Sequence, residues 1–287
     1  MPMPTDVGIV DTMISFPLKD PKATYAFVTR QLKDDTAKDF EFPVEYMFKD
    51  VPHPDTEDDP VAVTLREMDR HGIAVGLVAV GRGAAGQRAV KEHPDRFVAS
   101  LSVDPNDGMK ALRAIDEAKA QHDLRAVEVF PAGTFPQVAI NDKRMYPLYA
   151  KCCELDLPIF VCAGVPGPRL RMEPQKVEFI DEVMYDFPEL VFVTRHGCEP
   201  WTELAVKLML KWPGLHYSTS AFAPKYYPRD IINYANTRGA DKVIYAGYFP
   251  MGLSLERIMR EMPGVPFHDD VWPKFLRENA ARVLKLS

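Results

Sequence analysis

Short apolar segments alternate with segments of helical periodicity along nearly the whole chain, and this alternation limits the possible folds more than any other feature. Repeated strand–helix units favour a parallel sheet covered by helices. The predicted strands are Gly8–Ile14, Ala74–Val80, Phe97–Val103, Ala126–Phe130, Ile159–Ala163, Val191–Thr194, His216–Ser220 and Lys242–Ala246. The predicted helices are Pro60–His71, Ala84–His93, Met109–His122, Lys143–Leu155, Pro174–Phe187, Trp201–Trp212, Pro228–Thr237 and Leu253–Met262.

The number of units favours a closed barrel. Eight strand–helix units close a (β/α)8 TIM barrel, whereas a doubly wound open sheet usually has about five to seven strands. A GxGxxG spacing does occur at Gly81–Gly86, but it follows the second strand, and no acidic residue ends the next strand. An open nucleotide-binding sheet is therefore the weaker alternative. We predict one α/β TIM-barrel domain over the 287 residues, 1–287.

Two segments add to the bare barrel. Residues 19–59 contain a helical stretch followed by aromatic and proline-rich sequence, and they follow the first strand. Insertions after a barrel strand fall on the C-terminal face, where barrel enzymes bind substrates. We predict that this insertion caps a pocket, with residues 40–60 forming part of its roof. Residues 271–286 have helical apolar spacing and are predicted to form a closing helix.

Composition excludes several classes of function. The net charge is −6 and the basic residues are scattered, so we expect no nucleic-acid partner. The absence of an apolar run of about 20 residues and of a signal-peptide pattern predicts a cytoplasmic protein that does not engage a membrane. Four cysteines in a chain of this length do not predict a disulfide framework. Composition leaves a small molecule or another protein as the expected partner, and the arginines described next favour a small anionic molecule.

Polar residues follow the predicted strands at the ends that share one face of the barrel. Arginine binds carboxylate and phosphate bidentately, which suits an anionic substrate. Some of these arginines are expected instead to pair with acidic neighbours, including Glu199, or to be solvated. The predicted substrate-binding residues are Asp11, Ser15, Arg82, Glu128, Arg169, Arg195 and Ser220.

The order of several short segments resembles the amidohydrolase-related (amidohydrolase 2) family over nearly the whole chain, from Ile9 to Leu286. The segments are "EMDRHGI", "RFVASLSVDP", "VEVFPAG", "PIFVCAG", "FPELVFVTRHGCEPW", "KVIYAGYFP" and "ENAARVLKL". The resemblance implies a TIM barrel with hydrolase or decarboxylase activity. Many members use one divalent metal, and many form dimers. We therefore expect a homodimer.

The family's metal-ligand positions are altered in this sequence. According to the resemblance, Met13, Ser15, Cys162 and Tyr248 replace the usual ligands, and only His196 is retained. A thioether and an alcohol are poor ligands for Zn²⁺ or Mn²⁺. We therefore expect no metal and no other cofactor. Met13 is expected to be a packed apolar residue, and Ser15 either a hydrogen-bonding group of the pocket or a turn cap.

Three residues are candidates for catalysis. His196 is predicted to transfer protons with a pKa near neutrality, or else to be a structural histidine. Cys162 is either a thiolate nucleophile activated by that imidazole or a small buried apolar residue. Tyr248 is either a hydrogen-bond donor to an oxyanion or a rim aromatic residue.

Three functions remain open at this stage. The first is a metal-independent hydrolase of a small or medium carboxylate-, lactone- or acyl-type substrate. The second is an inactive barrel that binds a ligand or an active paralogue. The third is a decarboxylase or lyase in which arginines hold a carboxylate and His196 protonates the product carbon.

Overall fold

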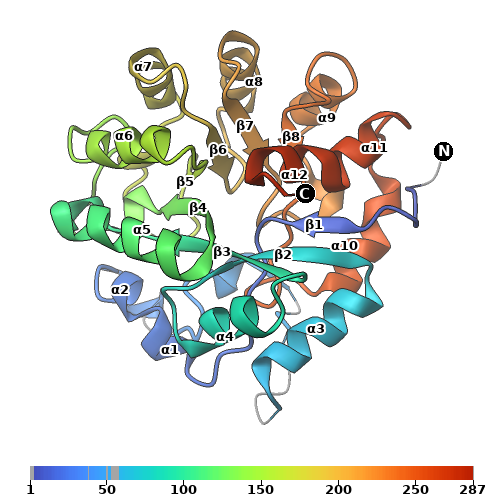
Figure 1. The fold of residues 1–287 in the computed structure, drawn as a ribbon, viewed down its shortest axis with the longest axis horizontal. Helices are drawn as coiled ribbons and strands as arrows, with labels where there is room; N and C mark the ends of the chain where they lie inside the picture. Colours follow the sequence, from blue (N-terminus) through green and yellow to red (C-terminus); the bar gives the residue numbers. More distant parts are fainter. Residues whose placement is uncertain (1–2, 38, 50, 53–57, 287) are drawn as a thin grey trace.

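The eight strands form one parallel sheet that curls into a barrel (Figure 1). The computed structural model describes residues 3–37, 39–49, 51–52 and 58–286. Strand order follows chain order, which confirms the predicted α/β barrel and excludes an open sheet whose order reverses. The strands are β1 Ile9–Asp11, β2 Ile73–Ala79, β3 Phe97–Ser102, β4 Leu124–Val129, β5 Ile159–Cys162, β6 Phe192–Arg195, β7 Leu215–Ser218 and β8 Val243–Ile244.

Residues just after β1 and β8 hold the first and last strands together. The backbone N–H and the hydroxyl of Thr12 both donate to the carbonyl of Tyr245, over 3.4 and 2.9 Å. The backbone N–H of Gly247 donates to Asp11 Oδ1 over 2.8 Å. β1 therefore ends at Asp11 rather than at the predicted Ile14, because the following backbone bonds to the segment after β8 instead of to β2.

Helices surround the sheet (Figure 1). Several begin later than predicted: proline introduces a 3₁₀ turn at Glu173–Gln175, so the helix predicted from Pro174 starts at Phe179. The helices are α1 Pro21–Thr24, α2 Ala26–Thr29, α3 Pro60–Arg70, α4 Ala84–Glu92, α5 Met109–His122, α6 Tyr146–Glu154, α7 Phe179–Asp186, α8 Thr202–Lys211, α9 Arg229–Ala235, α10 Leu255–Glu261, α11 Val271–Pro273 and α12 Asn279–Leu284. None of the helices in the described ranges is long and apolar enough to span a bilayer.

The closing helix covers one end of the barrel. A π-helical turn, Lys274–Glu278, joins α11 to α12, so residues 271–284 form one continuous helical segment, as predicted. Apolar residues of α12 pack against the inward-facing side chains of the strands. This cluster contains Val10, Leu77, Ala126, Phe160, Val193, Ile244, Ala280, Val283 and Leu284. With one end closed, the C-terminal face is left for a site.

The insertion after β1 lies against loops of that face. Gln31 donates to the carbonyl of Gly133 after β4 over 2.8 Å, and the Tyr46 hydroxyl donates to the carbonyl of Gly167 after β5 over 2.6 Å. The Phe42 ring packs 6.1 Å from the ring of Tyr248 after β8. These contacts join the insertion to three different strand ends. Residues 38, 50 and 53–57 of the predicted cap lie outside the described residues.

Candidate active site

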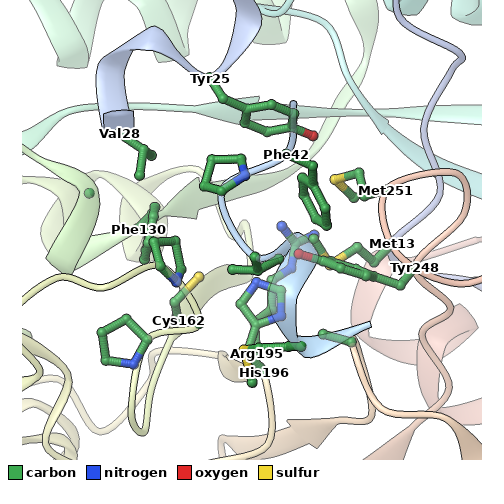
Figure 2. Close-up of a pocket in the computed structure, with 18 of the residues that line it drawn as sticks. Met13, Tyr25, Val28, Phe42, Phe130, Cys162, Arg195, His196, Tyr248 and Met251 are labelled. Atoms are coloured by element: carbon green, nitrogen blue, oxygen red, sulfur yellow. The ribbon is translucent and has the colours of Figure 1, made fainter. Parts of the chain in front are cut away.

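A pocket of about 1180 Å³ opens at the C-terminal ends of the strands (Figure 2). Its floor consists of strand-end residues, and its wall includes aromatic and apolar residues of the insertion. The insertion residues that line it include Tyr25, Phe27, Val28, Phe42, Val44, Tyr46, Met47 and Phe48. A volume of this size accommodates a small or medium organic ligand.

A buried ion pair forms part of the floor. Arg195, the last residue of β6, contacts both carboxylate oxygens of Glu128 on β4, with Nη1 at 2.9 Å and Nη2 at 3.0 Å. The two side chains are only 6% and 13% exposed. Burial by itself would raise the pKa of Glu128, but the charge and hydrogen bonds of Arg195 lower it to about 2. Glu128 is therefore ionised and engaged, and it is a poor proton acceptor for a substrate.

The Arg195 guanidinium has further contacts besides Glu128, and one of its nitrogen atoms has no partner. Nη2 also donates to the carbonyl of Thr12 over 3.0 Å, and the guanidinium carbon lies 4.9 Å from the centre of the Phe160 ring. Nε is buried and has no hydrogen-bond partner in the described part of the chain. Nε is therefore out of reach of a ligand in the pocket, and leaving it unpaired costs about 1–3 kcal/mol. Arg195 itself lines the pocket, so the floor carries a positive charge that an anion can approach.

A second cation lies at the pocket wall. Arg82 follows β2, is exposed, and has its guanidinium carbon 5.6 Å from the centre of the Phe27 ring of the insertion. Its charge helps to lower the pKa of Glu128. The predicted cationic pocket therefore contains Arg82 and Arg195, with Ser15 at its edge.

His196 reaches the pocket through an unusual backbone conformation. Successive strand residues face opposite sides, so a residue after the inward-facing Arg195 would ordinarily face away. His196 instead has φ of +65°, and Gly197 follows with φ of +87°. This left-handed turn brings His196 to the pocket, where its ring lies 5.7 Å from that of Tyr248.

Burial and the neighbouring Arg195 charge lower the pKa of His196 to about 3. The pKa near neutrality predicted for this histidine is therefore wrong, because the sequence did not show how strongly the ring is desolvated. The imidazole is neutral at physiological pH. Its part in catalysis remains a prediction.

Cys162 and Tyr248 line the same pocket in their protonated forms. Burial raises the pKa of the Cys162 thiol to about 12, against the opposing charge of Arg195. Burial also raises the pKa of Tyr248, whose ring stacks 5.5 Å from Phe48 of the insertion. A thiolate at Cys162 is thus disfavoured. A phenol that retains its proton fits the donor role predicted for Tyr248.

Three residues predicted to bind substrate do not line the pocket. Asp11 is fully buried below it, where its carboxylate accepts from the backbone of Met13 and Gly247. Arg169 lies outside, paired with Asp34. Ser220 lies behind His196. The reason is common to all three: proximity to a strand end does not determine which way a side chain points.

Several pocket residues were missed from the sequence, and Ser102 and Gln175 show two different reasons. Ser102 ends β3, a strand at whose end no site residue was predicted, and its hydroxyl donates to Glu128 over 3.1 Å. The same strand-end rule would have found it. Gln175, in the 3₁₀ turn before α7, lines the pocket and donates to the carbonyl of Gly164 over 3.0 Å. No sequence signal pointed to Gln175, because only the folded loop brings it there.

The donor groups at the floor do not fit a divalent metal. No group of three or more His, Cys, Asp or Glu side chains with suitable placement occurs among the described residues. Glu128, the carboxylate at the floor, is occupied by Arg195, whose positive charge repels a cation. The thioether of Met13 and the protonated Cys162 and Tyr248 complete a set that is unsuited to Zn²⁺ or Mn²⁺.

Comparisons with known proteins agree with this architecture. A family model described as Amidohydrolase matches residues 10–286. No curated protein sequence matches. Among solved structures, the uncharacterized TIM-barrel protein Bb4693 of Bordetella bronchiseptica has 24% identity and a TM-score of 0.73, over 96% of this chain and 98% of that one.

Two decarboxylases share the fold at lower identity. The 2,6-dihydroxybenzoate decarboxylase of Rhizobium has 15% identity and a TM-score of 0.67, with 97% of this chain and 99% of that one covered. The 5-carboxyvanillate decarboxylase of Novosphingobium aromaticivorans, solved with manganese, has 14% identity and a TM-score of 0.71, with 98% and 97% covered. At these identities the likeness extends to the fold alone.

Proposed function

The chain belongs to the amidohydrolase family, and we propose that it is a metal-independent enzyme of that family, acting on a small or medium organic anion. One observation carries the proposal: the Arg195 guanidinium is paired with Glu128 at the floor of an otherwise largely apolar pocket. A fixed positive charge in such a place stabilises negative charge that develops on a substrate oxygen. It does so without a metal ion.

The lining of the pocket suggests the character of the substrate. A carboxylate or carbonyl oxygen would bind at Arg195, and the aromatic residues of the insertion would cover an apolar body. Arg82 would attract the anion or bind a second acidic group. A carboxylate-bearing lactone, ester or acyl compound meets these requirements.

Hydrolysis is our first candidate for the reaction, because Arg195 can stabilise the tetrahedral oxyanion of an acyl substrate. Tyr248 is a second donor in the same pocket. Decarboxylation is the second candidate. It is favoured by a specific observation: Glu128 and His196 both have strongly lowered pKa values, so neither is a good base for activating water. Loss of CO2 needs no such base: the C–C bond breaks, CO2 leaves, and the product carbon takes its proton from water, since the neutral His196 has no extra proton to give.

The lack of a good base at Glu128 and His196 is also compatible with a third function, the binding of a ligand without turnover. One experiment separates the three. A panel of carboxylates, lactones and acyl thioesters is screened by thermal shift, since a binder stabilises the native state by mass action. Binders are then incubated with the enzyme in ¹⁸O-labelled water after removal of metals by chelation.

Hydrolysis would place one ¹⁸O atom in the product, and decarboxylation would release CO2. Either result without added metal supports the proposal, and turnover only after metal is restored overturns it. Binding without either product would show a binding protein. Arg195→Lys is expected to reduce turnover by about 10²–10³-fold, because the bidentate fork is lost. The matched control is Arg169→Lys, at an arginine outside the pocket.

A further inference from the structure

Two serines lie behind His196, on the side away from the pocket. The backbone N–H of His196 donates to Ser220 Oγ over 3.1 Å, and the Ser218 hydroxyl donates to the same oxygen over 3.3 Å. His196 Nδ1 lies 3.4 Å from Ser220 Oγ. Both serines are fully buried, so water does not compete for these groups.

The number of protons in this cluster decides the state of the imidazole. Ser220 Oγ has two lone pairs, which accept from the His196 backbone and from Ser218, and one proton. The remaining neighbour of that hydroxyl is His196 Nδ1. The Ser218 hydroxyl has no other hydrogen-bond partner among the described residues, so its proton is used only if it is donated to Ser220 Oγ. The Ser220 proton is then directed at Nδ1, which is the unprotonated nitrogen of a neutral ring. The proton of the ring lies on Nε2.

We infer that Ser220, supported by Ser218, is a positioning residue that holds His196 in the Nε2–H tautomer, so that the imidazole offers the pocket a hydrogen-bond donor. The hydrogen bond made by one ring nitrogen sets the state of the other. His196 therefore differs from the general base that its position at a strand end predicted. It is an electrophilic group.

The role of the Nε2–H tautomer in catalysis rests on the proposed function. No hydrogen bond of His196 Nε2 occurs among the described residues, and His196 and the adjacent Arg195 both line the pocket. A substrate oxygen at the floor would meet the positive charge of Arg195 and the neutral Nε2–H donor of His196. A neutral imidazole polarises a carbonyl without adding a second buried charge beside Arg195.

The tautomer is tested on the full-length protein without any ligand. The histidine side chains are labelled with ¹⁵N, and the ring signals are recorded at pH 7. The chain has seven histidines, and comparison with His196→Gln assigns the signals of His196. We expect a protonated Nε2 and an unprotonated Nδ1 in the unmodified protein. Ser220→Ala is expected to give a mixture of tautomers, and Ser220→Thr, which keeps the hydroxyl, to restore the single state.

A protonated Nδ1 in the unmodified protein overturns the inference, as does an unchanged tautomer in a folded Ser220→Ala variant. The unmodified spectrum decides alone if that variant does not fold. Ser102→Ala is the matched control, because it removes a pocket hydroxyl that contacts Glu128 and not His196. Since no substrate is used, this result stands apart from the turnover test of the proposed function.

Discussion

Two arginine–carboxylate pairs on the same face of the barrel show how location changes the meaning of one interaction. Arg195 and Glu128 form a pair at the pocket floor that is 6% and 13% exposed. Arg169 and Asp34 form an outer pair, away from the pocket lining, that is 38% and 36% exposed. Water screens the outer pair, whereas each buried charge depends on its partner.

The two pairs also differ in what surrounds them. Arg169 has a second partner in Thr36, and its guanidinium carbon lies 4.8 Å from the centre of the Tyr46 ring, so it fastens the insertion to the loop after β5. Arg195 lines the pocket, with Glu128 as its counter-ion. The Arg169–Asp34 pair is therefore a structural contact, whereas the Arg195–Glu128 pair places a fixed charge at the pocket, where a ligand can bind.

The largest effect is expected from breaking the inner pair on one side. Glu128→Gln leaves the buried Arg195 charge without a counter-ion and is expected to lower the free energy of unfolding by about 3–5 kcal/mol. Urea denaturation at pH 7 measures this. Replacing both partners by Met should recover most of the loss, because no unpaired charge remains. A Glu128→Gln variant as stable as the unmodified protein would contradict the account.

Asp11 lies close enough to Arg195 of the inner pair to be influenced by its charge, and it is expected to make the free energy of unfolding depend on pH. Burial raises the pKa of Asp11 from 3.8 to about 6, although the N–H groups of Gly247 and Met13 and the charge of Arg195 oppose it. Between about pH 4 and 6 the native state keeps this proton and the unfolded state releases it. Stability from this group therefore falls as pH rises through that range, and the loss is complete above pH 6.

Asp11→Asn removes the titration while its Oδ1 still accepts from both backbone groups. Relative to the unmodified protein, the variant should become more stable by up to about 3 kcal/mol as the pH is raised from 4 to 7, at about 1.36 kcal/mol per pKa unit. Denaturation curves at several pH values measure the difference. A difference that stays constant over this range would rule out the raised pKa.

The smallest effect is expected at the outer pair. Asp34→Asn should change the free energy of unfolding by less than about 1 kcal/mol, because both partners are partly solvated. Ligand-induced thermal shifts should be unchanged, since neither residue lines the pocket. Isothermal denaturation and the thermal-shift screen measure the two quantities. If Asp34→Asn lowered the free energy of unfolding as much as Glu128→Gln, the two pairs would not differ as described.

The barrel itself was predictable from local patterns. The alternation of apolar strands and amphipathic helices determines a parallel sheet, and the count of units determines closure. The polar residues that end the strands were recognised for the same reason, so Glu128, Cys162, Arg195, His196 and Tyr248 were all expected on one face, and all line the pocket. The periodicity of the apolar residues and the order of the strand and helix segments can be read from the sequence without knowledge of the fold.

The chemistry of that face depended on the folded structure. Glu128 and Arg195 are far apart in the chain, and their pairing follows from strand positions that no local pattern encodes. The lowered pKa of His196 and the burial of Asp11 below the pocket depend on how much water the surrounding side chains exclude. Desolvation and side-chain direction are set by neighbours distant in sequence. The sequence by itself therefore determined the barrel and its polar face, while only the tertiary structure decided which of those residues form the site and in what charge state.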